Sequence, residues 1–496
     1  MAGSRGFSTT RVRKCPVLMA DTLACEVLIV GSGPGGSVTA SRLARAGFDV
    51  LLVEEGPDTR ASDVPPYSSA EMDLKYRNTG LTPCLGKARV TYAEARCLGG
   101  GSEVNSGFFQ RAPDDILRSW NIPDLDLAHL EPYYAEIGDR LRVGCVEGPE
   151  GRTSLKVKQG ADRLGWGSDE VARWIESRPT VDGGWTFSRS GMTRTYIADA
   201  EAAGARVMSG LAVDTLIRKG GRVVGARARM VSGYLTQGHV DIRCRYAFVC
   251  AGAICTPALL RRSGIRRRVG NSLELHPMVR VVATFDETVD ESGFGVPVRQ
   301  VHQFKPELTL GCSVSSPSHL ALWMAGRRPE EIDEIAPRTA VFYALVRSPS
   351  RGWIRKAPLF PDPLVFFDLS RDDYARVSDG MRKLAEMLFL AGAREVMLPM
   401  AGQPPAHSLP EVDLILARIP RVRPEVTAIH LFASCPLGAE GTAPLDFYGK
   451  VRASANLFVN DSSMLPGSVG VNPQATVMAV ALRNVEHFIA ATRPHP

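Results

Sequence analysis

A glycine-rich turn near the amino terminus constrains this chain more than any other feature. The turn, Gly31 to Gly36 with the sequence GSGPGG, follows the apolar segment 25–30 and precedes residues 37–46, which carry small and apolar side chains at helical spacing. A second apolar segment lies at 50–53. The order strand, glycine turn, helix and strand predicts one βαβ unit, with the turn at the carboxyl end of its first strand.

The spaced glycines of this turn fit the pattern G-x-G-x-x-G, in which each glycine has its own task. Gly31 permits the tight turn, Gly33 lets the backbone approach a pyrophosphate, and Gly36 lets the helix pack closely on the strand. The helix N-terminus then offers free N–H groups to phosphate. Glu54 ends the second strand, where a carboxylate can accept hydrogen bonds from ribose hydroxyls. The motif predicts a dinucleotide, and its place ahead of a second glycine-rich loop favours FAD over NAD.

Length and charge narrow the class of protein further. A chain of 496 residues exceeds what one hydrophobic core usually supports, so we expect two domains. The formal net charge is +6 at pH 7, but Arg5, Arg11, Arg13 and Lys14 all precede the first acidic residue, Asp21. The rest of the chain is therefore close to neutral, which gives no support for nucleic-acid binding.

The first twenty residues and the cysteines indicate where in the cell the protein is expected. Residues 1–20 are rich in Arg, Ser and Thr and lack acids, a composition that suits an organelle transit peptide. We nevertheless expect a disordered tail or an upstream start, with Met19 as the true start, and keep the transit peptide as the alternative. No apolar run is long enough for a transmembrane segment. Ten cysteines show no Cys-x-x-Cys pair and no metal-like spacing. We therefore expect reduced cysteines, no metal site and a cytoplasmic protein.

Further along the chain, periodicity predicts a series of elements. Residues 88–107 read as a glycine-rich loop, and 206–240 alternate apolar and polar side chains around Gly220-Gly221, as in a hairpin. Residues 247–251 form an apolar strand that leads into a helix at 256–262. The region 275–423 shows mixed strands and one clear helix, 378–391. A strand at 457–459 and a helix at 474–491 complete the pattern.

Four separated motifs resemble the glucose–methanol–choline (GMC) oxidoreductase family. The segment 96–107 (RCLGGGSEVNSG) matches the first family signature, and 252–265 (GAICTPALLRRSGI) matches the second, although Arg266 stands where a glycine is usual. The C-terminal segment 456–473 (NLFVNDSSMLPGSVGVNP) looks most like the cholesterol oxidase branch. Residues 270–277 (GNSLELHP) look more like the long-chain alcohol oxidase branch.

The resemblance implies an α/β protein whose Rossmann-type FAD-binding domain is discontinuous in sequence. Segments 21–110, 190–275 and 425–496 would form that domain, and 111–189 and 276–424 would form an inserted substrate domain built on an antiparallel sheet with helices. Val104 stands where some members carry a histidine bonded to the flavin, so we expect non-covalent FAD. The expected cofactor-binding residues are Gly31, Gly33, Gly36, Glu54, Gly100, Ser102, Asn105, Val213, Asp461 and Pro473.

The family also places a reacting pair in the C-terminal part of the chain. His430 lies in HLFASCPLG, which resembles a family motif that has glycine at the position of Ala433, and Asn472 stands where the second residue of the pair is expected. Histidine can accept a proton near neutral pH, whereas asparagine can only orient or stabilise an oxygen. We expect His430 to be the general base and Asn472 to hold the substrate oxygen. His276, ahead of Pro277, is interpreted as structural packing.

These features predict an enzyme that oxidises an alcohol to a carbonyl compound by hydride transfer to flavin N5. Its partners would be a small-molecule alcohol and O2 or another electron acceptor. A redox-neutral lyase of the hydroxynitrile type remains the alternative, and a flavin-binding scaffold without chemistry is a third possibility. Sterols, fatty alcohols, sugars and other hydroxyl compounds all remain open, because the variable domain supplies the substrate contacts.

Overall fold

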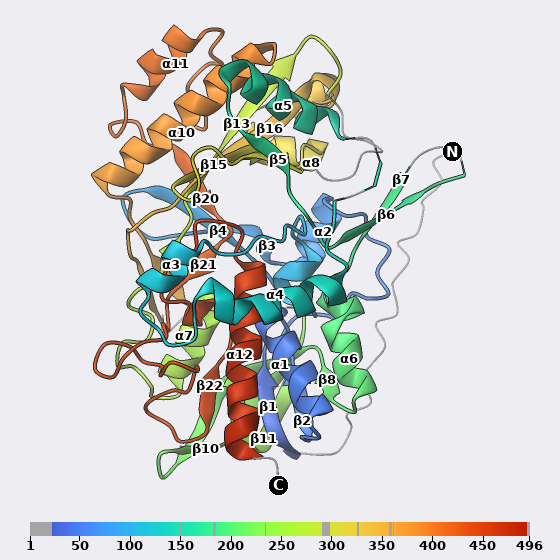
Figure 1. The fold of residues 1–496 in the computed structure, drawn as a ribbon, viewed down its shortest axis with the longest axis vertical. Coiled ribbons are helices and arrows are strands. Elements are labelled where there is room, and N and C mark those ends of the chain that lie inside the picture. Colours follow the sequence, from blue (N-terminus) through green and yellow to red (C-terminus); the bar gives the residue numbers. More distant parts are fainter. Residues whose placement is uncertain are drawn as a thin grey trace.

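Two large sheets organise the molecule in the computed structural model. It describes residues 22–145, 147–148, 150–181, 185–233, 235–289, 298–324, 327–356, 360 and 362–493. The sheets have seven and nine strands, and helices pack on both (Figure 1). The expected mixed α/β class with a Rossmann-like unit is confirmed. The 1–20 tail lies outside the described residues.

The seven-stranded sheet begins with the βαβ unit predicted from the glycine turn. β1 (Thr22–Val30) pairs in parallel with β2 (Val50–Val53), and α1 (Pro34–Arg45) connects them. The strand order is β8-β2-β1-β11-β10-β9, and β22 pairs with β11. Its other strands are β8 (Arg206–Met208), β9 (Leu211–Lys219), β10 (Arg222–Ser232), β11 (Leu235–Val249) and β22 (Leu457–Val459). β2 and the second half of β1, residues 27–30, are apolar and buried, as expected for parallel strands covered on both faces.

The nine-stranded sheet has the order β3-β4-β20-β13-β16-β15-β14-β5, and β19 also pairs with β13. All its pairings are antiparallel except β4 with β20. Its strands are β3 (Tyr76–Pro83), β4 (Arg89–Ala95), β5 (Ser168–Glu170), β13 (Met278–Phe285), β14 (Arg299–Val301), β15 (Leu308–Cys312), β16 (Thr339–Val346), β19 (Ala393–Met397) and β20 (Glu425–Ala428).

Three two-stranded units lie outside these sheets in the described part of the chain. They are β6 (Ile175–Pro179) with β7 (Trp185–Arg189), β12 (Glu274–Leu275) with β21 (Leu431–Phe432), and β17 (Trp353–Arg355) with β18 (Leu364–Phe366). The β12–β21 pair holds His276 close to His430, because each histidine is the neighbour of a paired residue.

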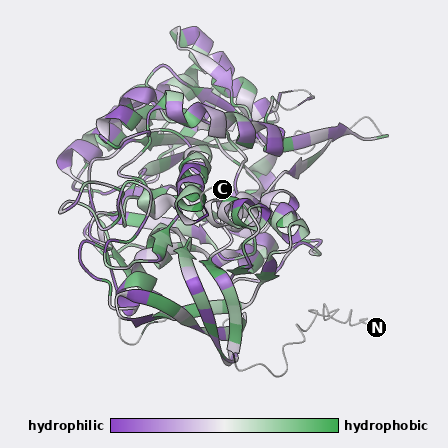
Figure 2. Cartoon of the chain, turned by 60° about the horizontal axis from the view of Figure 1, so that its bottom comes forward, coloured by the Kyte–Doolittle hydropathy of each residue, from purple (hydrophilic) through white to green (hydrophobic). Residues whose placement is uncertain are grey.

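Helices cover the sheets from outside. α12 (Gln474–Thr492) packs against α1 and α4, and α10 (Arg371–Leu390) packs against β16, α5 and α11 (Figure 1). The remaining helices are α2 (Ser69–Lys75), α3 (Asp114–Ser119), α4 (Leu127–Leu141), α5 (Arg152–Leu164), α6 (Tyr196–Ala202), α7 (Gly252–Arg262), α8 (Pro317–Trp323), α9 (Pro329–Ile335) and α11 (Leu409–Leu416). Figure 2 shows much of the hydrophilic colour on helices at the periphery and hydrophobic stretches along the strands.

Several local expectations need correction. Residues 89–95 are not loop but the strand β4, whose alternating Val90 and Tyr92 are buried. The helix expected at 378–391 begins earlier, at Arg371, because Ser370 caps it and forms a capping box with Asp373. The region 275–423 also contains the short helices α8, α9 and α11. α1 starts at Pro34, inside the glycine turn rather than after it.

The strands also show how the predicted domain ranges relate to the sheets. β3, β4 and β20 lie in ranges assigned to the FAD-binding domain, yet they hydrogen bond within the nine-stranded sheet. The division into two domains therefore stays a prediction. Across the described residues no helix combines the length and apolar character that membrane crossing requires.

Candidate active site

A cavity of about 890 Å³ brings together most of the residues singled out by sequence. Its wall includes the glycine turn after β1, the loop around Gly100, strands β13 and β16, and the C-terminal residues His430 and Asn472. The volume lies within the usual range for small-molecule and cofactor sites, roughly 300 to 1,000 Å³. The cavity thus joins the Rossmann-like sheet to the nine-stranded sheet.

The N-terminus of α1 meets this cavity in a form suited to phosphate. Gly33 is the N-cap residue, and no side chain caps the helix. Gly33 and Gly35 line the cavity, and a Cβ at Gly33 would meet no protein atom within 4 Å. The first N–H groups of a helix lack intrahelical partners and attract anions. This open, uncapped helix end therefore fits a pyrophosphate without any change in the backbone.

The other glycines of the two turns serve close packing. Gly31 has a φ of +100°, and a Cβ there would lie 2.4 Å from the carbonyl oxygen of Cys250. A Cβ at Gly36 would lie 2.0 Å from the carbonyl oxygen of Gly31, so this glycine permits the helix–strand contact and does not line the cavity. A Cβ at Gly100 would lie 2.7 Å from Gly33 Cα. The two glycine turns therefore touch.

Glu54 lies at the cavity wall with most of its acceptor capacity already used. Its carboxylate accepts hydrogen bonds from Ser32 N (3.0 Å), Ser32 Oγ (2.7 Å) and Gly56 N (2.9 Å). Burial raises the pKa of this carboxyl group, and those hydrogen bonds oppose the rise. A carboxylate offers roughly four acceptor positions. The side chain can therefore take about one further hydrogen bond, fewer than the two ribose contacts the sequence suggested.

The remaining cofactor candidates divide into two groups. Val213 and Pro473 line the cavity directly. Asp461 also reaches it, but its carboxylate accepts from Ser463, Thr256 and the backbone N–H of Gly252, so it braces the start of α7. Ser102 is fully buried away from the cavity, where its hydroxyl donates to Gly99 O at 2.9 Å and accepts from Met192 N at 2.9 Å. Ser102 therefore shapes the loop and does not contact the cavity.

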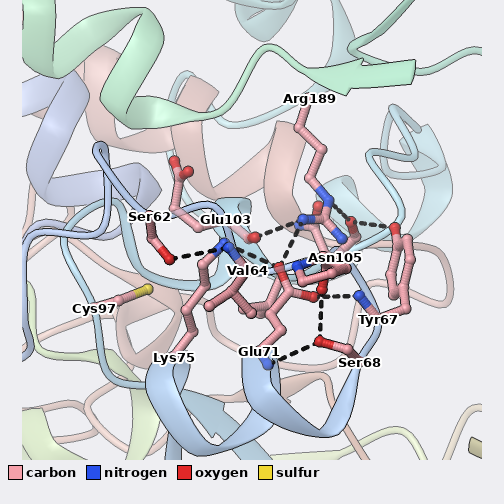
Figure 3. Close-up of polar contacts among 12 residues, drawn as sticks. Ser62, Val64, Tyr67, Ser68, Glu71, Lys75, Cys97, Glu103, Asn105 and Arg189 are labelled. Atoms are coloured by element: carbon pink, nitrogen blue, oxygen red, sulfur yellow. Dashed lines mark hydrogen bonds and ion pairs between the residues drawn. The ribbon is translucent and has the colours of Figure 1, made fainter. Parts of the chain in front are cut away.

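Asn105 is held at the cavity wall by a buried polar cluster (Figure 3). Arg189 donates from Nε to the Asn105 carbonyl oxygen at 2.8 Å and from Nη1 to the Glu103 carbonyl oxygen at 2.8 Å. Glu71, itself buried, lies between Arg189 (3.3 Å) and Lys75 (2.9 Å). The Asn105 side chain donates to Gln474 Oε1 at 2.7 Å, at the start of α12.

His430 and His276 form a buried pair rather than separate residues. Nδ1 of His430 lies 3.0 Å from Nδ1 of His276, and Nε2 of His276 accepts from the N–H of Gly470 at 3.2 Å. On the other side, Nε2 of His430 lies 3.4 Å from Nδ2 of Asn472. His276, interpreted from sequence as packing, therefore contacts the ring of the predicted base.

The protons available to this pair cannot satisfy all three contacts at once. A neutral imidazole carries one N–H and one acceptor nitrogen. The outer partners, Gly470 N–H and Asn472 Nδ2, are both donors, so satisfying both would place a proton on each of the facing Nδ1 atoms. Two neutral rings therefore leave one contact unmade. Either His430 carries its proton on Nε2, or it carries it on Nδ1 and leaves Nε2 free to accept.

Burial keeps both rings neutral. Burial is the largest cause that lowers the pKa of His430, to about 4, and it also lowers the pKa of His276 well below the usual value. A positive charge on His430 and the charge of Arg347 further lower the pKa of His276. A neutral His430 is the form that can accept a proton.

The orientation of the Asn472 amide follows from a chain of hydrogen bonds that starts at Lys305. Lys305 Nζ donates to Gln300 Oε1 at 2.9 Å, which fixes Gln300 Nε2 toward Asn472 Oδ1 at 3.3 Å and toward the Tyr343 hydroxyl at 2.6 Å. A protonated lysine can only donate. Asn472 therefore presents Nδ2, a donor, toward His430 and the cavity.

Three residues after His430, Ala433 adopts a backbone conformation that favours glycine. This residue has a φ of +58°, a left-handed conformation that costs a non-glycine residue roughly 1–2 kcal/mol. The resembling family has glycine at this position. Ala433 O accepts from the Ser272 hydroxyl, and Ser434 O accepts from Gly270 N at 2.7 Å. The turn keeps its shape because the segment before β12 holds it.

Sequence reasoning missed the roles of His276, Gln300 and Lys305, and it also missed Arg280. The pairing of His276 with His430 spans 154 positions, and no local pattern reveals it. Gln300 and Lys305 lie in no motif recognised in the sequence. Arg280 did leave a signal, because it is the single charge in the apolar run Met278 to Ala283. No group of acids, histidines and cysteines suited to a metal ion occurs among the described residues.

Comparison with known proteins identifies the family to which this chain is similar. Two family models described as "GMC oxidoreductase" match residues 72–278 and 356–481. A third model, described as "NAD(P)-binding Rossmann-like domain", matches residues 29–76. A GMC-type oxidoreductase of Sinorhizobium fredii is 34% identical, with 94% of each chain covered. A long-chain-alcohol oxidase of Arabidopsis thaliana is 26% identical and covers 92% of this chain and 67% of its own. Among solved structures, formate oxidase superposes with a TM-score of 0.75 at 15% identity, covering 96% of this chain and all of its own.

Proposed function

The chain belongs to the GMC oxidoreductase family, and from this membership we propose that it binds FAD non-covalently and oxidises an alcohol to a carbonyl compound. The observation that carries the proposal is the position of His430 and Asn472. Their facing atoms are 3.4 Å apart at the wall of the same cavity that contains the uncapped N-terminus of α1. The long-chain-alcohol oxidase of Arabidopsis supports an alcohol as the substrate class.

The residues of the cavity fit a dinucleotide of this kind. The N-terminus of α1 at Gly33 and Gly35 would hold the pyrophosphate, and Glu54 would accept a hydrogen bond from the ribose. Val213 and Pro473 would contact the cofactor from the wall, and the braced Asn105 segment would lie along it. Bound FAD supplies the acceptor for the hydride that leaves the alcohol carbon.

His430 would take the hydroxyl proton. Its Nε2 faces the cavity side of the pair, and the ring is neutral because burial lowers its pKa to about 4. Nε2 accepts a proton only in the tautomer that carries hydrogen on Nδ1, which then donates to His276 Nδ1. A substrate hydroxyl that donates to Nε2 favours this tautomer. His276 is therefore a positioning residue for the base.

Asn472 would hold the substrate oxygen as its proton leaves. Gln300 occupies the amide oxygen, so the Nδ2 donor is the group that remains for the substrate. A donor placed where negative charge develops lowers the barrier because it needs no rearrangement during the reaction. His430 as the base and Asn472 as the donor would thus both contact the substrate oxygen.

The test is anaerobic reduction of the bound flavin by a panel of alcohols. His430→Ala should slow reduction by about a hundredfold to ten-thousandfold, the usual effect of losing a general base. Asn472→Ala should slow it by roughly a hundredfold, as for loss of one oxyanion donor. The double variant should lose less than the product of both, because the residues share one oxygen.

A surface histidine provides the control. His129→Ala removes a side chain that is 53% exposed, and it should reduce flavin at the wild-type rate. Flavin reduction in His430→Ala at the rate of His129→Ala would refute the assignment of the base. Consumption of a cyanohydrin while the flavin stays oxidised would favour the redox-neutral lyase instead. Turnover with O2 and with an artificial acceptor would identify the reoxidant.

A further inference from the structure

One arginine in the cavity has a charge that no other group balances. Arg280 lies on β13 and lines the cavity wall. Its guanidinium carbon is 4.2 Å from the ring centroid of Trp323, at the end of α8. Nη1 of Arg280 and Nε1 of Trp323 are both buried donors without an acceptor in the described part of the chain. Arg280 as a whole stays partly exposed because it borders the open cavity.

The other arginines of the cavity wall are satisfied. Arg77 pairs with Asp362 at 3.0 Å, and Arg96 pairs with Glu55 at 3.2 Å. Two more complete the set: Arg229 pairs with Asp214 at 2.8 Å, and Arg262 donates to Asp214 O at 2.8 Å. The acids of the wall are engaged in these pairs or in the hydrogen bonds of Glu54 and Asp461 described above, except Glu94. Glu94 Oε2 lies 3.7 Å from Arg77 Nε and has no hydrogen-bond partner among the described residues. Within the described residues, Arg280 alone among the wall arginines has neither a carboxylate nor a carbonyl partner.

This arrangement is costly unless a ligand completes it. A buried charge without a partner loses its solvation, and no protein contact replaces it. Burial lowers the pKa of Arg280 to about 10, so the group remains a cation at neutral pH. Contact with the Trp323 ring offsets only part of this loss. A planar guanidinium with free donors matches the two oxygens of a carboxylate.

Arg280 also lies on the sheet face that serves the reacting pair. It is the cross-strand partner of Tyr343 on β16, and the Tyr343 hydroxyl accepts from Gln300, which orients Asn472. Met278, two residues before Arg280 on the same face, pairs with Thr427, three residues before His430. A ligand that bridged this face would contact Arg280 at one end and the His430–Asn472 pair at the other.

Resting on the alcohol oxidation proposed above, we propose that the substrate is an alcohol that also carries an anionic group, and that Arg280 binds this group. The carboxylate would replace the missing acceptor for the Arg280 donors while the hydroxyl contacts His430 and Asn472. The length of the substrate between its two ends must match the separation of these groups across the sheet. Arg280 is thus the residue that selects charged over neutral alcohols.

The experiment uses the flavin-loaded enzyme and a series of ω-hydroxyalkanoates of increasing chain length, each compared with its own methyl ester. Acid and ester present the same hydroxyl and differ in charge. For the best chain length, wild-type kcat/KM for flavin reduction should favour the acid by about tenfold to hundredfold, the usual effect of a charge-assisted hydrogen-bonded pair. Arg280→Met should remove this preference, and Arg280→Lys should restore part of it.

Arg89→Met is the matched control, because Arg89 lies on β4 of the same sheet with a side chain that is 56% exposed. It should keep the preference for the acid. Equal rates for acid and ester in the wild-type enzyme would overturn the inference about Arg280 while leaving alcohol oxidation intact. Loss of flavin from purified Arg280→Met would also overturn it, because Arg280 would then serve the cofactor.

Binding gives a readout that does not depend on oxidation. Alkanoates without a hydroxyl group should perturb the flavin absorbance of the wild-type enzyme at a Kd about tenfold to hundredfold lower than in Arg280→Met. If no alcohol reduces the flavin but this difference persists, the anion site stands and the proposed oxidation fails. If alkanoates bind both proteins equally, the anion site is refuted.

Discussion

His276 offers a direct test of how the buried histidine pair sets the chemistry of His430. The two nitrogens of His276 have different partners, since Nδ1 faces His430 at 3.0 Å and Nε2 accepts from Gly470 N at 3.2 Å. The amide of asparagine can occupy the place of Nδ1, and the longer glutamine can place its amide near Nε2. His276→Asn therefore keeps the contact to His430, and His276→Gln keeps the contact to Gly470.

The two variants should be equally destabilised. Each leaves one buried polar group without a partner, which costs about 1–3 kcal/mol of unfolding free energy. In the substrate-free protein, where His276 Nε2 accepts from Gly470 N–H, His276→Asn leaves Gly470 N–H unpaired and His276→Gln leaves His430 Nδ1 unpaired. Thermal or urea unfolding of the holoenzyme measures this loss. Similar stability in the two proteins makes any difference in rate attributable to the pair itself.

The rates of anaerobic flavin reduction should differ between His276→Asn and His276→Gln. In His276→Asn the amide oxygen can accept from His430 Nδ1–H, which keeps Nε2 free for the hydroxyl proton, so reduction should stay near the wild-type rate. In His276→Gln the ring loses the partner that orients it, and a loss of about 1–3 kcal/mol in the transition state slows reduction by roughly tenfold to hundredfold. Equal rates in both variants, or slowing that follows stability alone, would refute this account of His276.

Two further predictions concern the cofactor and pH. Acid precipitation should release FAD into the supernatant, because Val104 stands at the position of the linking histidine; flavin that remains with the precipitated chain would contradict non-covalent binding. The free energy of unfolding should fall as pH drops below about 6.5, because His276 and His430 stay neutral in the folded protein but take up protons in the unfolded chain. Each ring should contribute a slope of up to about 1.4 kcal/mol per pH unit, and for His430 this slope should continue down toward pH 4. Urea unfolding across this pH range should show that slope, and His276→Asn should flatten it; an unchanged slope would mean that other groups cause it.

The glycine turn and its βαβ unit were predictable because their signal is local. The turn residues, the helix that follows and both strands lie within one short stretch, and the structure places them as expected apart from the earlier start of α1. The strand β4 was missed because the glycines after it dominated the pattern. Its neighbour β20 lies more than 300 residues away, and that pairing cannot be inferred from either segment alone.

For the candidate site too, the sequence predicts residues within local motifs but not their distant contacts. His430 and Asn472 were identified because they lie in motifs that resemble a known family, and their assignment remains a prediction. The partners that set their protons and orientation lie far from them along the chain: His276 follows β12, and Gln300 is in β14. His276 lies in the motif 270–277, but nothing in that motif indicates its contact with His430, and Gln300 belongs to no motif. Hydrogen-bond donors and acceptors across such distances become visible only when the fold brings them together.

The pairing of β1 with β11 has a consequence for synthesis of the chain. β1 ends at Val30, but its parallel neighbour is completed only at Val249, and β22 adds to that neighbour at Leu457 to Val459. At a translation speed of 5–20 residues per second, the apolar edge of β1 waits roughly 10 to 40 s on the ribosome before its partner exists. During that time the nascent chain exposes a segment able to pair with other chains, so the yield of folded enzyme should depend on chaperones that shield it.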